Sequence, residues 1–414
     1  MLSRQYGGVA KRFASASAAQ ARSSAQDKTS VLNNGLTVSS IELNGATSQL
    51  VLAFRAGSRY QPANKQGLVH LVRNSIGRDS QEFPGLSLVW NTAANGGQLT
   101  ASSNKDLLAI QIGVVRNNAP VALSILGQLG NNAFKPWDVE EVAAETIKRD
   151  QAKRCGNNIV LEQLHEAAFR NGPLSRSSYI QEHSISAKDL SAFAKERLIS
   201  GEAVLVGVNV DHDELVHVAS QQFPLREGSA SQTAGSTYFG GDVRRDGKGA
   251  ETYVAIAGEG ASLKNTKDVA VQAVIAQIFA RAAEKAGVEA RVVNLNYQDG
   301  GLVGLQFSAS NKNVNSHTKS LINAIRSAKV ADLENAKKAA VNEVLSNAQT
   351  ASSVALDRAS QILAGAEVVT PSEFAEQIKS VSSDDVSKAL KKVSSKLSLA
   401  AYGTPSLVPY ADEL

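Results

Sequence analysis

The chain has 414 residues, of which 43% are hydrophobic and 20% are charged, and its formal net charge is +4. A chain of this length exceeds what one hydrophobic core usually supports, so two domains are expected. No apolar run reaches the roughly 18 residues that cross a bilayer, which excludes a membrane-spanning helix. Cys155 is the only cysteine, so an internal disulfide is excluded as well.

The first 26 residues differ in composition from the rest of the chain. They contain Arg4, Lys11, Arg12 and Arg22, no acidic residue, and many serines and alanines. This composition predicts a mitochondrial transit peptide at residues 1–26, largely absent from the mature protein; the alternative interpretation is a disordered tail. Removing these four cations from the 43 basic residues leaves 39 against 39 acidic residues. A neutral body of this kind argues against a nucleic-acid partner.

Strands and amphipathic helices alternate between residues 30 and 225, which predicts an α+β sandwich for the first half of the chain. The expected strands are 36–43, 50–54, one around 86–100, 107–115 and 203–210. The expected helices are 67–74, 119–129, 139–154, 160–169, 187–198 and 213–223.

The pattern starts again after an irregular stretch. Residues 226–249 are rich in Gly, Ser, Thr and Arg and have no hydrophobic period, which predicts a linker. Beyond it, residues 381–387 resemble residues 185–191 at an offset of 196, and each segment is followed by a helix and an apolar strand. This internal similarity predicts that residues 250–414 form a second half related to the first.

Residues 67–74 read Gly-Leu-Val-His-Leu-Val-Arg-Asn. Taken without its surroundings, this octet is typical of an apolar helix that buries one histidine. It also resembles a degenerate form of the His-x-x-Glu-His motif of inverted zinc peptidases, in which two histidines bind zinc and the glutamate accepts a proton from the bound water. Here His70 keeps the first position, Arg73 replaces the base and Asn74 replaces the second ligand. A guanidinium repels a divalent cation and cannot accept a proton.

The segments around the octet favour the peptidase interpretation. An apolar strand leads into the turn Gly57-Ser58-Arg59, and Gly67 opens the motif helix. Residues 95–101 carry the pattern Gly-Gly-x-Leu-x-Ala, and residues 297–302 carry Tyr-x-Asp-x-Gly-Leu. Together these segments resemble the pitrilysin-like peptidases, over about residues 30–414. That family includes the mitochondrial processing peptidase and the two core proteins of ubiquinol–cytochrome c reductase.

The resemblance implies two related α+β halves joined by a linker, and it implies where the third zinc ligand would lie. In the family this ligand is a glutamate on a helix similar to residues 136–154, where Asp150 is the matching residue by local pattern. A site with His70 and Asp150, but without a second histidine or a base, is not expected to hold zinc. The resemblance therefore implies a degenerate motif (His70, Arg73, Asn74 and Asp150) with no catalytic residue, no metal and no cofactor.

The resemblance also implies a choice between two non-catalytic roles. The non-catalytic processing-peptidase subunit carries a glycine-rich loop in its second half, whereas the corresponding residues 279–287 here predict a helix with one glycine. This departure favours a structural core subunit of the reductase (respiratory complex III), on the matrix side of the mitochondrial inner membrane. The implied partners are a core protein 1-like chain, cytochrome b and cytochrome c1, with contact to the membrane only through partner subunits.

Overall fold

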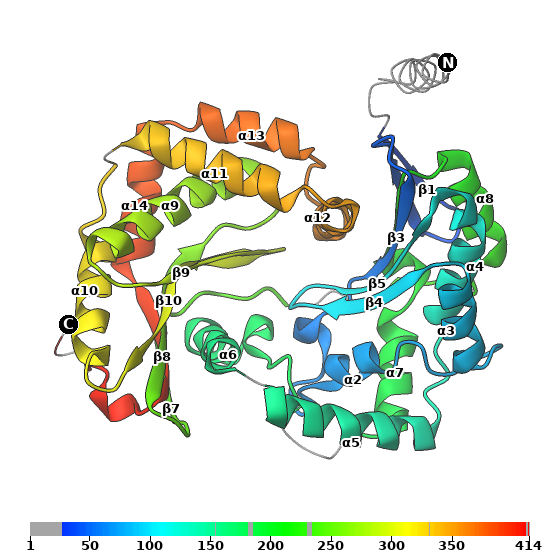
Figure 1. Cartoon of the computed structure of the whole chain (residues 1–414), viewed down its shortest axis with the longest axis horizontal. Helices are drawn as coiled ribbons and strands as arrows, with labels where there is room; N and C mark the ends of the chain where they lie inside the picture. Colours follow the sequence, from blue (N-terminus) through cyan, green and yellow to red (C-terminus); the bar gives the residue numbers. More distant parts are fainter. Residues whose placement is uncertain are drawn as a thin grey trace, which may run out of the picture.

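Two mixed β-sheets, one in each half of the chain, organise the fold (Figure 1). The computed structural model describes residues 27–153, 155–180, 185–229, 234–330, 332–410 and 413, without the side chains of residues 147 and 150–153. The predicted transit peptide, residues 1–26, lies outside the described residues. Among those described, no helix is both long and apolar enough to cross a bilayer.

The first sheet has the strand order β1-β2-β6-β3-β5-β4. Its strands are β1 (Lys28–Val31), β2 (Thr37–Ile41), β3 (Thr47–Phe54), β4 (Gln98–Ser103), β5 (Leu108–Val115) and β6 (Ala203–Val208). The strands β2 and β6 run parallel and every other pair is antiparallel. The helices of this half are α2 (Leu68–Asn74), α3 (Gly85–Ala94), α4 (Ala119–Leu129), α5 (Pro136–Lys153), α6 (Gly156–Phe169), α7 (Ala187–Arg197) and α8 (His212–Gln222).

The second sheet repeats this topology without an equivalent of β1. Its strands are β7 (Gly241–Asp246), β8 (Glu251–Gly260), β9 (Arg291–Tyr297), β10 (Gly300–Ser310) and β11 (Leu397–Gly403), in the order β7-β11-β8-β10-β9. The pair β7–β11, which corresponds to β2–β6 of the first sheet, is parallel, and the other pairs are antiparallel. The helices of this half are α9 (Thr266–Lys285), α10 (Val314–Arg326), α11 (Leu333–Asn347), α12 (Ala351–Ala364), α13 (Pro371–Ser380) and α14 (Ser383–Ser395). The predicted α+β fold of two related halves is confirmed.

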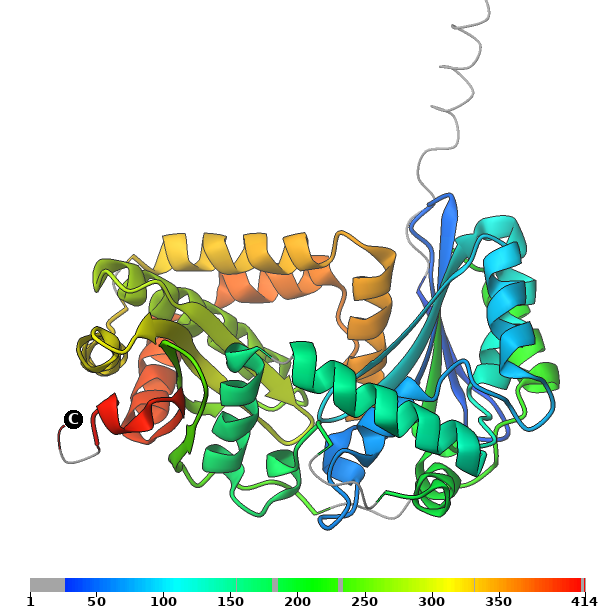
Figure 2. The ribbon, with the colours of Figure 1, turned by 60° about the horizontal axis from the view of Figure 1, so that its bottom comes forward.

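Helices α6 and α12 each pack against the sheet of the other half (Figures 1 and 2). The N-terminal helix α6 contacts β7, β8 and β11, and the C-terminal helix α12 contacts β3, β5 and β6. Strand β3 shows why the first sheet needs a helix from the other half, because the strand is apolar on both of its faces. Its residues Leu50, Leu52 and Phe54 enter the core of the first half, whereas Val51 and Ala53 point to the opposite face, against Ala355 and Ala359 of α12. A strand buried on both faces is continuously apolar, and α12 supplies the second cover.

Two expectations from the sequence were wrong in detail. Residues 85–94 form helix α3, not the first part of a strand, because only Leu88, Thr92 and Gly85 turn toward the protein, at helical spacing. The chain enters β4 only at Gln98. The second part of the predicted linker is strand β7, which pairs in parallel with β11 and so becomes the edge of the second sheet.

Candidate functional site

The degenerate motif lies on α2, a helix of 7 residues whose N-terminal end is closely packed. Gly67 precedes it with φ +89°, and a Cβ there would lie 2.4 Å from Cα of Ile180, so only glycine fits. His70 is buried, and its ring lies 5.5 Å from the ring of Tyr179. Arg73 and Asn74 are half-buried on the next turn.

A second cation from α5 occupies the position next to Asn74. The Asn74 amide donates to the carbonyl of His70 at 2.7 Å, and its oxygen accepts a hydrogen bond from Arg149 Nη2 at 2.6 Å. The residue in place of the second ligand is therefore engaged by a guanidinium. The motif thus carries one cation of its own, Arg73, and contacts a second, Arg149, through Asn74. Positive charge at these positions disfavours a divalent metal ion.

Asp150, the residue predicted to match the third ligand, lies on α5, but its side chain lies outside the described residues. Among the side chains that are described, no group of three or more His, Cys, Asp and Glu is arranged to hold a metal ion. Arg149 was not anticipated from the sequence. The sequence did place Arg149 directly before Asp150, the predicted third-ligand position, and the helix that carries both packs against α2.

The two turns that carry family motifs meet where the halves join. Arg59, 3% exposed, donates from Nη1 to Asp106 at 2.8 Å and from Nη2 to Asp299 at 2.6 Å. Asp106 belongs to the first half and Asp299 to the turn between β9 and β10. Gln298 beside it donates its backbone N–H to Asp106 and accepts from the hydroxyl of Tyr60. Burial alone would lower the pKa of Arg59, but the two carboxylates outweigh it and raise that pKa, so the side chain stays charged.

A second buried group joins α6 to the second sheet. His165 Nδ1 donates to the carbonyl of Leu161 at 2.7 Å, and Nε2 accepts from the hydroxyl of Tyr297 at 2.7 Å. Burial and the charge of Lys105 lower the pKa of His165 to about 4, and burial raises the pKa of Tyr297. This pair is therefore neutral at physiological pH.

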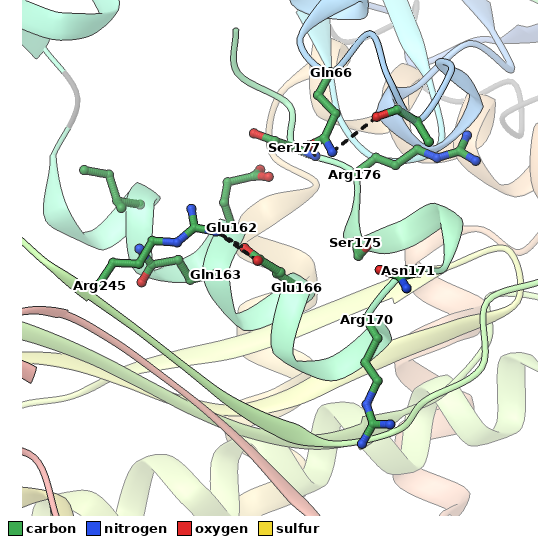
Figure 3. Close-up of a pocket in the computed structure, with 12 residues that line it drawn as sticks. Gln66, Glu162, Gln163, Glu166, Arg170, Asn171, Ser175, Arg176, Ser177 and Arg245 are labelled. Atoms are coloured by element: carbon green, nitrogen blue, oxygen red, sulfur yellow. Dashed lines mark hydrogen bonds and ion pairs between the residues drawn. The ribbon is translucent and has the colours of Figure 1, made fainter. Parts of the chain in front are cut away.

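A polar pocket of about 350 Å³ lies beside this group, between α6 and residues 170–177 (Figure 3). Its carboxylates already have cationic partners. Lys105 Nζ lies 2.7 Å from Glu162, and Arg245 Nη2 lies 2.7 Å from Glu166. Burial would raise the pKa of Glu162, but Lys105, His165 and two hydrogen bonds lower it overall. Held ionised in this way, Glu162 is poorly suited to proton transfer. The pair of Glu166 with Arg245 joins α6 to β7 of the second half.

Two further pockets adjoin each other. One, of about 290 Å³, lies between the halves and is also lined by Arg55 and Asp106 of the first half. The other, of about 380 Å³, lies within the second half. Both are lined by Leu263, Asn294, Asn296 and Asp357. The larger one is mostly apolar and lies among α9, α11, α12 and α13, with Val344 and Phe374 in its wall. Asp357 is exposed to the cavity, and desolvation by the surrounding protein raises the pKa of its carboxyl group.

The chain has two halves with the same sheet topology, and the first carries a degenerate zinc-peptidase motif. Together these features define a two-domain peptidase scaffold, and comparison with known families identifies the family. Residues 37–181 match the family model described as Insulinase (Peptidase family M16). Residues 184–363 match the Peptidase M16 inactive domain. The chain belongs to peptidase family M16.

Individual relatives in this family include respiratory and processing proteins. The chain is 26% identical to mouse cytochrome b-c1 complex subunit 2, mitochondrial, over 92% of this chain and 91% of the relative. It is 24% identical to mitochondrial-processing peptidase subunit alpha-2 of Dictyostelium discoideum, over 89% of each. A solved structure, complex III2 from Candida albicans with Inz-5 bound, contains a chain of the same fold, with a TM-score of 0.78 at 19% identity over 93% of this chain and 98% of that one.

Proposed function

We propose that this protein is core protein 2 of mitochondrial ubiquinol–cytochrome c reductase, a structural and non-catalytic subunit. It would lie on the matrix side of the inner membrane, bound to a core protein 1-like chain, cytochrome b and cytochrome c1. The observation that carries the non-catalytic part is the pair of guanidiniums at the motif, with Arg149 hydrogen-bonded to Asn74 at 2.6 Å. An intact motif has a base and a histidine at positions 73 and 74.

Two observations support the assignment to the reductase. Cytochrome b-c1 complex subunit 2 from mouse, rat and human aligns over 92% of this chain in each case. In addition, α9 continues as a helix to Lys285, through the segment where the non-catalytic processing-peptidase subunit would carry its glycine-rich loop. We also propose the division into halves at 30–225 and 250–414, with the join at 226–249, although residues 241–246 of the join form β7 and belong to the second sheet.

A second candidate is the alpha subunit of the mitochondrial processing peptidase. Processing-peptidase alpha subunits from Dictyostelium and Arabidopsis match at 24% to 26% identity over at least 89% of this chain. Because the two kinds of relative differ so little in identity, the choice between them needs an experiment on the assembled protein.

The experiment is purification of the tagged native protein from mitochondria in a mild detergent. A core subunit co-migrates with cytochrome b and cytochrome c1 and is released from the membranes by alkaline carbonate, because its attachment depends on protein contacts. A processing-peptidase subunit would instead be found as a dimer in the matrix fraction. Recovery of that dimer alone would reject the proposal.

A further inference from the structure

Helix α3 lies on the outer side of the first half (Figure 1), and four apolar side chains on it or just before it are exposed to solvent. Leu86 is 82% exposed, Trp90 68%, Phe83 47% and Val89 41%. Leu86, Val89 and Trp90 follow the spacing i, i+3, i+4, so they form one ridge along the helix. These four residues are called the α3 face below.

The α3 face is a fixed feature of the surface. Asp79 Oδ1 accepts a hydrogen bond from the backbone N–H of Gly85 at 2.7 Å, and Lys135 holds Asp79 in place at 2.6 Å. A Cβ on Gly85 would lie 2.4 Å from the backbone of Arg78, so the first turn packs directly on that backbone. Leu88 anchors the opposite side of the helix in the core. The exposed ridge is therefore held in position.

Charge is absent from the whole segment. No Asp, Glu, Lys or Arg occurs from Pro84 to Gly97, a run whose polar side chains are only Ser, Thr and Asn. Single exposed apolar residues are common, whereas a ridge of them without any charge is typical of a protein contact. The missing Lys and Arg also disfavour an anionic lipid surface as the occupant, since such surfaces attract cations.

We propose that the α3 face docks against an uncharged, apolar helix surface of a different subunit in the assembly. The occupant must be uncharged, because a buried charge would find no partner on the α3 face and its desolvation would oppose binding. A second copy of this chain is a poorer fit. Two such ridges stacked on each other would bury only about 1,000 Å², the lower limit for a stable pair. Within a larger assembly, the same ridge needs to supply only one contact among several.

The proposal rests on the proposed function only in that the chain works within a multi-subunit assembly, and the test separates the two. A photoreactive benzophenone amino acid replaces Trp90 in the tagged chain, and the native complex is irradiated in mitochondria. The expected product is a crosslink to one other subunit, at an uncharged helical stretch that mass spectrometry identifies. The same probe in place of Leu345, an exposed residue of α11, is the matched control and should not give this product. A crosslink to lipid, to a second copy or to nothing would overturn the proposal.

Variants give an independent readout. Leu86→Glu and Trp90→Glu should each lower recovery in the complex at least tenfold, whereas Leu345→Glu should leave it unchanged. Because all three side chains are exposed, the purified variants should melt within a few degrees of the parent chain. Full recovery of both α3 variants would contradict the docking role. If the tagged parent chain carries neither cytochrome, the proposed function fails, but the crosslink still decides the docking.

Discussion

His70, Arg73 and Asn74 show how few substitutions separate a zinc site from a structural helix. The helix, the glycine before it and the buried histidine are all in place, and the change lies in the charge around them. Since Arg149 adds a second guanidinium from α5, restoring the motif alone would not remove all of the positive charge.

We therefore predict that the purified protein binds less than one tenth of an equivalent of zinc by elemental analysis. The double variant Arg73→Glu, Asn74→His should bind more zinc than the parent, and adding Arg149→Ala should strengthen binding again, because each step removes a cation or adds a ligand. One tightly bound zinc in the parent chain, lost on His70→Ala, would contradict the prediction.

Asp299 should be worth far more to stability than an exposed acidic residue. Asp299→Ala leaves the buried guanidinium of Arg59 with only one carboxylate, and breaking a buried pair costs about 3 kcal/mol, less where solvent reaches the partner. Asp299 retains 23% exposure, so about 2 kcal/mol is expected in urea unfolding. Glu376→Ala breaks a surface pair with Lys379 and should change stability by less than about 0.5 kcal/mol. Equal losses for the two variants would refute the assignment.

His165 should make stability fall with decreasing pH. Its pKa is about 4 in the folded chain against an ordinary value of 6.5. Between these values the unfolded chain takes up a proton that the folded chain does not. Stability is thus lost as the pH falls from about 6.5 toward 4, by at most about 1.4 kcal/mol per pH unit. In urea unfolding at pH 7.5 and 5.0, His165→Gln should lose part of this slope, whereas the exposed control His217→Gln should keep it.

At the scale of single elements, the contact between α12 and the first sheet depends on small side chains. Ala355 and Ala359 are fully buried against β3 and β6, so a larger residue has no space. Ala359→Leu should lower the free energy of unfolding by about 1–3 kcal/mol through overpacking. The same change at the exposed Ala94 of α3 should have little effect. An unchanged free energy of unfolding for Ala359→Leu would contradict the close packing of α12 on the sheet.

The sequence was sufficient for some elements and insufficient for others, for physical reasons. Strand β3 is continuously apolar over residues 50–54, and the helix expected at 119–129 is α4 at these same bounds. The segment before Gln98 was misassigned because Leu86, Leu88 and Trp90 alternate as in a strand, although only Leu88 is buried. The motif residues were identified by their chemistry. The contact of Arg59 with Asp299, across 240 positions of the chain, is set by how the halves dock, which no local pattern encodes.

At the scale of the whole molecule, the exchange of α6 and α12 joins the halves into one unit. Each sheet has a face that only the other half covers, and the buried ion pair of Arg59 and Asp299 lies at the same joint. Thermal unfolding should therefore show one cooperative transition.

The prediction is that neither half is stable alone. Residues 27–229 without α12 should expose Val51, Val204 and Val206, and should aggregate or bind a hydrophobic dye. Producing residues 27–229 together with 234–414 should restore a soluble complex, because both exchanged covers are then present. A monomeric, dye-free N-terminal half would show that α12 is dispensable.

Because α6 and α12 each cover the sheet of the other half, the order of synthesis determines when the chain can fold. A chain that emerges from the ribosome, or from a membrane pore, in order from its N terminus completes every strand of the first sheet at Val208. Helix α12, which covers the face of that sheet turned toward the second half, begins only at Ala351. More than a hundred residues of synthesis or translocation therefore separate an apolar surface from its partner, and an unfinished chain is aggregation-prone throughout that interval. Folding is thus tied to the arrival of the C-terminal half, and a chain truncated before α12 would be a substrate for chaperones and proteases.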